Sequence, residues 1–281
     1  MAVLPLILGL CLAPEAHPSP AAEALAEAHA RYERRADGAR GPVASRVPIE
    51  GAIAAYRRAA ALDPGSIEAR VGLIRALFFR GGFTDADPEA ERRTFAEAKE
   101  VAVGAVLDLE TSLGRPRGAA RLAALGKVKD AAALYLWSSI AWGQWAISTS
   151  KLSAARSGAA GKIRDLAQTS IALDPTLEQG SAYLILGRLH DQSPRIPFLT
   201  FFISRKAALR NLELALSSSP RNTAAQYFLA EAILHHAPER ETEARRLLAA
   251  CASATPRPEL RVEDAHYSEL ARLRLAELDA P

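Results

Sequence analysis

Apolar residues of alternating size recur along the chain at spacings that are typical of paired helices. In Ala208–Pro220, a small, a large and a small apolar residue are separated by four and then three positions, and a proline follows five positions later. The same spacing recurs in Ala52–Pro64 and, with a serine as the third residue, in Ile163–Pro175. Small residues let two antiparallel helices approach closely, and the proline ends the second helix. The pattern predicts repeated helix hairpins.

Helical periodicity continues along the rest of the chain. No stretch shows the sustained alternation of apolar and polar residues, bounded by turn pairs, that is typical of strands. The predicted fold class is therefore all-α. The predicted helices cover residues 21–37, 47–62, 67–80 with a glycine cap at 81–82, 89–109, a short segment between 114 and 126, 130–150, 154–173 with a break near 158–161, 177–190, 205–218, 223–235, 239–252 and 262–278.

The hairpin spacing resembles the tetratricopeptide (TPR) repeat, and we predict TPR-like stacked helix hairpins in an α–α superhelix over residues 21–281. The repeats are irregular, because Pro175 and Pro220 are 45 residues apart against about 34 in a regular repeat. Residues 192–202, with two prolines and three phenylalanines, account for the added length. These phenylalanines either fold back over the core or form an exposed edge for a partner.

Composition narrows the class of protein. Hydrophobic residues make up 49% of the chain and charged residues 24%, which is typical of a globular protein, and the mean hydropathy of -0.01 excludes a polytopic membrane protein. The net charge is +3, but basic and acidic residues alternate in segments such as 89–93 and 239–246. Mixed charge at helical spacing is typical of a solvated face. We therefore predict no nucleic-acid partner.

The first twenty residues differ from the rest. Residues 2–13 form an apolar run about as long as the core of a signal peptide, followed by a segment rich in proline and alanine, yet no Lys or Arg precedes Arg31. Leu8–Cys11 resembles a lipoprotein box, with Leu10 where a small residue is usual, so Cys11 is a candidate for lipidation. Residues 1–20 are predicted to be a signal- or lipoprotein-type leader, and a disordered start is the alternative.

Motifs for catalysis are absent from the sequence. It contains no glycine-rich phosphate loop, no His-Glu-x-x-His, no Gly-x-Ser-x-Gly and no Cys-x-x-Cys. The adjacent His235 and His236 have no carboxylate or cysteine at ligand spacing in the sequence. We predict no enzymatic activity, no cofactor and no metal site. An enzyme would require acid–base groups to gather from distant helices.

Aromatic residues concentrate in one predicted helix, where Tyr135, Trp137, Trp142 and Trp145 include every tryptophan of the chain. Trp137 and Trp145 lie on one face, at i and i+8, and Trp142 lies on its flank. The rings either anchor neighbouring helices or line a pocket for an apolar ligand. We predict that Trp142 and Tyr135 face a ligand or partner and that Trp137 and Trp145 are more buried.

Several of these features occur in the same order as in a known family. The chain resembles the TPR-type T component of TRAP (tripartite ATP-independent periplasmic) transporters, the TatT-like family, over about residues 130–252. The segments that carry the resemblance are the aromatic helix 132–150, the Leu-Asp-Pro ending at 175, residues 180–189, the proline-containing loop and residues 228–231.

The resemblance implies an exported or lipid-anchored bacterial protein. It would bind a periplasmic solute-binding protein, take part in passing a small hydrophobic or organic-acid ligand, and self-assemble, although no residue in the sequence indicates an oligomer. Our first hypothesis is accordingly a non-enzymatic adaptor of the bacterial envelope. The alternative is a cytoplasmic TPR scaffold that recognises a peptide. Export of a reporter fused to residues 1–30 would separate the two.

Overall fold

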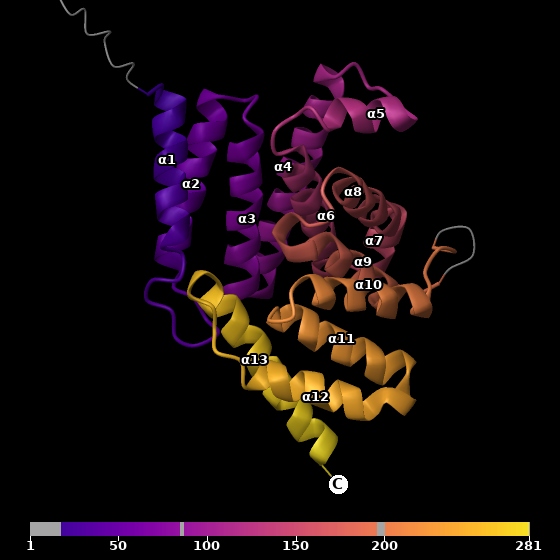
Figure 1. The fold of residues 1–281 in the computed structure, drawn as a ribbon. Coiled ribbons are helices and arrows are strands. Elements are labelled where there is room, and N and C mark those ends of the chain that lie inside the picture. The colour runs from indigo at the N-terminus through magenta and orange to yellow at the C-terminus, as the bar shows by residue number, and fades with distance from the viewer. Residues whose placement is uncertain (1–17, 85–86, 196–199, 281) are drawn as a thin grey trace, which may run out of the picture.

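The regular structure of this protein is helical throughout the part of the chain that is described. The computed structural model describes residues 18–84, 87–195 and 200–280. Within these ranges it contains thirteen α-helices, three short 3-10 segments and no β-strand (Figure 1). The prediction of an all-α fold is confirmed.

The first four helices stand side by side in chain order (Figure 1). Each packs against the next, and short connections make neighbours antiparallel. The approach of α2 and α3 is close because a glycine faces a ring: a Cβ on Gly72 would lie 2.2 Å from the ring of Tyr56. The helices are α1 (Pro20–Glu33), α2 (Arg46–Leu62), α3 (Ile67–Phe83) and α4 (Pro88–Ser112).

The aromatic helix α6 (Ala131–Ser148) is the central element of the fold. It packs against α3 and α4 on one side and against α8 (Ala159–Leu173) and α9 (Ser181–Gln192) on the other. A helix that is apolar around most of its circumference is stable only when neighbours cover it. Two short helices, α5 (Gly118–Leu125) and α7 (Lys151–Arg156), lie in the connections before and after α6.

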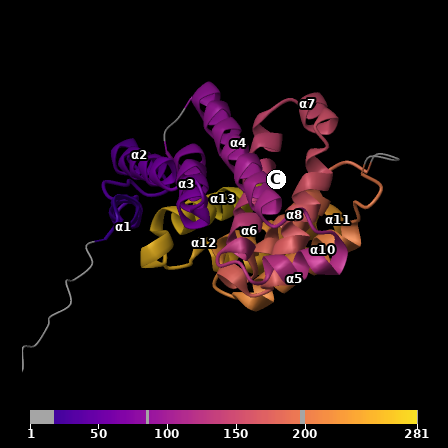
Figure 2. The ribbon, with the colours of Figure 1, turned by 90° about the horizontal axis from the view of Figure 1, so that it is seen from above.

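The chain continues as a stack of helices and then turns back. Helices α10 (Arg205–Ser218), α11 (Thr223–His236) and α12 (Glu241–Ala252) each pack on the previous one, and α13 (Arg261–Asp279) packs on α11 and α12. Figures 1 and 2 both show the first turns of α13 beside the N-terminal helices.

Contacts between α13 and the N-terminal helices join the two ends of the described chain. The Arg35 guanidinium lies 2.9 Å from the Glu263 carboxylate, across 228 residues of sequence. The rings of Phe83 and His266 meet edge to face at 5.4 Å. Val262 is fully buried in the same apolar cluster as Ala28. The arc of helices is therefore closed on one side by its own last helix.

Several local expectations are corrected or confirmed by the backbone. The α3 helix continues to Phe83 through Gly81 and Gly82, so these glycines do not cap it; a Cβ on Gly81 would lie 2.6 Å from the Phe95 ring, so this glycine gives that ring its space. Asp130 stands at the N-cap of α6 as expected, but its φ is 63° and its side chain caps no amide. The break near 158–161 is confirmed at Gly158.

The leader prediction concerns a segment that is mostly outside the described residues. Cys11 and residues 1–17 are not among them, so lipidation and export stay predictions. Among the described helices, none has both the length and the apolar character that crossing a membrane requires.

Close helix approach at Gly187 gives a test of the packing. A Cβ at this position of α9 would lie 2.5 Å from Leu212 Cγ and 3.0 Å from the Leu212 amide nitrogen. We expect Gly187→Ala to lower the free energy of unfolding by about 1–3 kcal/mol through overpacking. At Gly104, inside α4, an added Cβ would meet no atom within 4 Å. The control Gly104→Ala should raise the same quantity by about 1 kcal/mol. Equal effects in urea unfolding would contradict the packing.

Candidate functional site

A hollow lies on the concave side of the helix arc. Its volume is about 800 Å³. Side chains from α1, α3, α6, α9, α11 and α13 line it, so residues far apart in sequence face one space. Ligand pockets commonly have this size and form between helices, which makes the central cavity the candidate site.

One wall of the central cavity is aromatic. Trp137 of α6 and Phe78 of α3 meet edge to face at 5.7 Å, and Tyr32 of α1 lies beside them. Phe228 of α11 and Tyr267 of α13 form the opposite part, also edge to face at 5.3 Å. Rings of this kind offer large apolar faces to a ligand with little loss of side-chain entropy.

A left-handed turn fixes the orientation of Trp137. Glu178, Gln179 and Gly180 have φ values of 44°, 61° and 77° in succession, and the first two are not glycines. The Trp137 indole N–H donates to Glu178 Oε1 at 2.8 Å, and Gln179 Oε1 accepts from the Ser219 hydroxyl at 2.6 Å. Non-glycine residues in this conformation cost free energy and are frequent at functional sites. Here both side chains point into the wall of the cavity.

Two arginines in the cavity wall lack a carboxylate partner. Arg188 Cζ lies 3.7 Å from the centre of the Phe228 ring, and Arg188 forms no hydrogen bond or ion pair with any residue that the structure describes. Arg75 Cζ lies 5.3 Å from the Tyr32 ring and 5.2 Å from the Trp137 ring. Arg75 Nε is buried with no hydrogen-bond partner among the described residues. Burial lowers the pKa of Arg188, which reports the cost of keeping this charge away from water. The pKa of Arg75 is raised instead: burial opposes its charge, but Tyr32 and Glu178 outweigh the burial.

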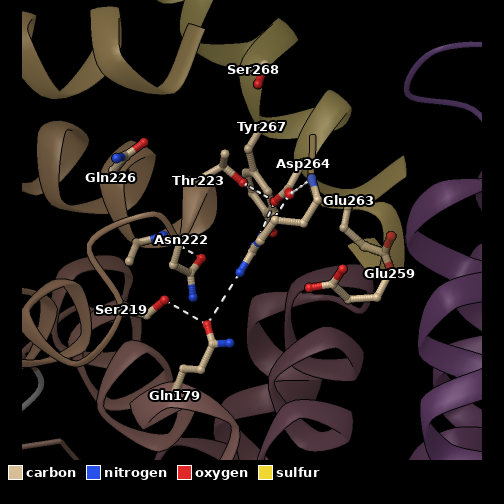
Figure 3. A network of polar contacts seen from close by, with 12 residues as sticks. Gln179, Ser219, Asn222, Thr223, Gln226, Glu259, Glu263, Asp264, Tyr267 and Ser268 are labelled. Carbon is tan, nitrogen blue, oxygen red and sulfur yellow. Dashed lines mark hydrogen bonds and ion pairs between the residues drawn. The ribbon is translucent and has the colours of Figure 1, made fainter. Parts of the chain in front are cut away.

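Two other arginines of the wall, Arg257 and Arg35, have carboxylate partners. Arg257 donates from Nε and Nη2 to the two oxygens of Asp264 at 2.8 and 2.7 Å, and the Thr223 hydroxyl donates to the same carboxylate at 2.7 Å. Figure 3 shows this network, in which Gln179 joins Asp264 through the arginine. Burial alone would raise the pKa of Asp264, but the hydrogen bonds from Arg257 and Thr223 outweigh it and hold the pKa below its usual value.

One carboxylate oxygen of the cavity lining is buried without a hydrogen-bond partner. Glu263 bonds to Arg35 through Oε1, whereas its Oε2 is buried without a partner among the described residues. Glu68 and Asp130 both pair with Lys129. Two further acids of the wall, Glu33 and Glu259, are exposed to solvent.

The unpaired groups are close enough to influence the same tyrosines. Burial raises the pKa of Tyr32; the charges of Arg35 and Arg75 oppose the shift and that of Glu263 adds to it. Burial also raises the pKa of Tyr267, with Arg188 opposing and Glu263 reinforcing. The charges of Arg75 and Glu263 therefore act on the pKa of Tyr32, and those of Arg188 and Glu263 act on the pKa of Tyr267. The free donors and the free acceptor face one space.

The four aromatic residues that the sequence singled out do not share one site. Trp137 lines the central cavity although its exposed fraction is only 6%. Trp142 lines a separate groove and is half-buried. Trp145 is also half-buried, 5.6 Å from Trp142 and under the Lys99 ammonium.

The expectation for Tyr135 needs correction. Its exposed fraction is 1%, and its hydroxyl donates to Glu110 and accepts from Arg121 Nη2 at 3.0 Å. The ring therefore anchors α6 to α4 and α5 and lines neither the cavity nor the groove. The relative exposure of Tyr135 and Trp145 is the reverse of the prediction, because the Glu110–Arg121 pair satisfies the tyrosine hydroxyl internally.

The phenylalanines of the segment after α9 differ in their exposure. Phe202 is half-buried, with the Arg164 Cζ 4.2 Å from its ring centre, whereas Phe201 is 63% exposed. Phe198 lies outside the described residues.

The sequence analysis did not predict the charged residues of the cavity as site residues, although the sequence carries a signal for two of them. Arg75 stands alone in the apolar run 71–79, and Arg188 stands alone in the run 182–189. A single charge within an apolar run is costly unless it has a partner or a task. Glu263 carried no such signal, because it lies in a helix rich in charge.

The described residues form no group that could hold a metal ion. Among residues 18–84, 87–195 and 200–280, no three His, Cys, Asp or Glu side chains are grouped so as to hold a metal ion. His235 and His236 both lie near Asp191 Oδ1, at 3.5 and 2.9 Å, so the carboxylate serves as their ion-pair partner. In the cavity itself, guanidinium groups and carboxylates provide charge. Tyrosine hydroxyls, whose pKa is raised by burial, stay protonated and provide hydrogen-bond donors.

Comparisons with known proteins assign no family. No protein-family model matches the chain, and no curated protein matches its sequence. The resemblance to the T components of TRAP transporters therefore stays a prediction.

The Arg257–Asp264 pair gives a stability prediction with a defined pH dependence. We expect Asp264→Asn to lower the free energy of unfolding by about 3–5 kcal/mol near neutral pH, because Arg257 would lose its partner in a buried site. Since the pKa of Asp264 is lowered on folding, its contribution is complete above the unfolded value near 3.9 and disappears as the pH falls further. Urea unfolding of wild type and variant from pH 7 to pH 2.5 measures this.

The control for this experiment is Asp165→Asn. Asp165 is 65% exposed and pairs with the adjacent Arg164, so its loss should cost less than about 1 kcal/mol. A difference between wild type and Asp264→Asn that stayed constant down to the lowest pH would show that the carboxylate charge is not responsible.

Proposed function

We propose that this protein is a non-enzymatic binding protein of TPR-like helix hairpins whose central cavity takes a small organic anion. The observation that carries the proposal is Arg188, which has no hydrogen bond or ion pair among the described residues and lies with Arg75 in an aromatic wall. An uncompensated charge away from water is costly, and proteins retain such a charge where a ligand supplies the partner. An anionic group between these guanidinium groups would form charge-assisted hydrogen bonds with them.

The ligand also carries a hydrogen-bond donor and an apolar body. Glu263 Oε2 is the free acceptor for that donor. The rings of Trp137, Phe78 and Phe228 would cover the apolar part. A site with buried polar groups rejects an analogue that leaves one of them unpaired, so the arrangement favours hydroxy- and amino-carboxylates over plain carboxylates of the same size.

The setting that we propose for this binding is the bacterial envelope. The protein would act as an adaptor that meets a periplasmic solute-binding protein of a TRAP-type transporter. Support comes from the resemblance over about residues 130–252 and from the apolar run at residues 2–13. Preformed helices would keep the entropy cost of binding low, because packing already fixes the side chains of the cavity. A cytoplasmic scaffold for a peptide, the alternative, would use the same concave side without a small ligand.

The test removes one arginine and follows the fluorescence of Trp137. In a background of Trp142→Phe and Trp145→Phe, Trp137 is the only indole. We expect mandelate or phenylalanine to change its emission. Phenylacetate has no hydrogen-bond donor for Glu263 and should bind about tenfold more weakly. Arg188→Met should weaken binding at least tenfold through loss of a charge-assisted bond. Its free energy of unfolding should be unchanged or higher, because an unpaired half-buried charge is removed.

Arg210→Met is the matched control. Arg210 is exposed on α10, outside the cavity, and its replacement makes the same change in net charge. Binding by Arg188→Met at wild-type affinity, or a Trp137 emission indifferent to every acid tried, would refute the proposal. Unfolding of Arg188→Met would instead assign the arginine a structural role.

A further inference from the structure

A second hollow lies outside the central cavity and shares no lining residue with it. This groove has a volume of about 530 Å³ and is bounded by α4, α6, α8 and the connection between α4 and α5. Its floor is apolar, formed mainly by Val103, Val106, Leu107, Leu166 and Trp142. Two of these, Val103 and Leu107, are 38% and 51% exposed, so the apolar surface is open to solvent.

The rim of the groove is basic. The side chains of Arg117 and Lys162 form no hydrogen bond or ion pair with any described residue, and the Arg115 guanidinium donates only to the Thr111 hydroxyl. The one carboxylate of the lining, Glu110, already pairs with Arg121 at 2.6 Å. Three cations therefore surround an apolar floor with no acid left to neutralise them.

Other acidic residues near the groove are also paired. Asp108 bonds to Arg70 at 2.7 Å, and Asp165 bonds to Arg164 at 2.7 Å. The positive charge at the rim is consequently not cancelled from the neighbouring turns of α4 and α8.

A buried hydroxyl without a partner lies in the same lining. Ser138 is 1% exposed, and its Oγ has no hydrogen-bond partner among the described residues. It stands one helical turn from Tyr135, whose hydroxyl meets Arg121. A ligand head group at the arginine end of the groove can therefore accept a hydrogen bond from Ser138, and this contact would satisfy the hydroxyl.

We propose that this groove binds a free amphiphilic carboxylate with a single medium-length chain. The carboxylate lies between the basic rim and Ser138, and the chain follows the apolar floor along α4 to Trp142. The stretch of α4 in the lining, from Ala102 to Glu110, spans about 12 Å, which sets the length that the floor covers. Each methylene buried there contributes about fourfold in affinity, and the head group supplies selectivity.

The experiment compares three head groups on one chain. Decanoate, decanol and decyltrimethylammonium are titrated below their aggregation concentrations into the full-length protein, with calorimetry as the readout. We expect decanoate to bind, decanol to bind at least tenfold more weakly, and the cation not to bind. Arg117→Glu should weaken decanoate binding at least tenfold, whereas Arg210→Glu, the same change on exposed α10, should not.

Two further variants separate this site from structural effects and from the central cavity. Ser138→Ala should weaken decanoate binding several-fold without lowering the midpoint of urea unfolding, because it removes an unsatisfied hydroxyl. Arg188→Met should bind decanoate like wild type, so failure of the central-cavity proposal would leave this one standing.

The assignment would be overturned by equal binding of decanol and decanoate, by decanoate binding that survives Arg117→Glu, or by binding that is lost in Arg188→Met. Flotation with anionic vesicles in the absence of decanoate binding would also overturn it, and would point to a membrane surface as the partner.

Discussion

The buried ion pair between Arg35 and Glu263 is the contact on which the shape of the molecule depends. Arg35 is 7% exposed and follows α1, and Glu263 lies in the first turn of α13, the last helix. Consecutive helices of a repeat stack contact mainly their neighbours, so such a stack leaves its concave side open. In this protein the pair holds the last helix against the first. The concave side thereby becomes a walled cavity with side chains from both ends of the chain.

Within that cavity, the charges divide into two groups with different consequences. Arg35 and Arg257 have carboxylate partners on α13 and hold the wall together. Arg188 has none, and burial disfavours its charge, whereas Tyr32 and Glu178 favour the charge of Arg75.

The fold could be predicted from the sequence further than the site could. Local spacing and capping depend on residues within a few positions, so the helices and the break at Gly158 were within reach. The course of α3 through Gly81 was not, because the ring of a distant residue, Phe95, decides it. Tyr135 was misjudged for the same reason, since its partners come from α4 and α5. The cavity forms because α13 packs against the N-terminal helices. No local sequence pattern predicts the contact between Arg35 and Glu263, which are 228 residues apart.

A double-mutant cycle on Arg35 and Glu263 tests the central claim most directly. The free energy of urea unfolding is measured for wild type, Arg35→Met, Glu263→Gln and the double variant. If the last helix closes the cavity through this pair, the two single effects should be coupled by about 1–3 kcal/mol. Strictly additive effects would mean that the two residues do not meet in solution, and the closed cavity would have to be abandoned.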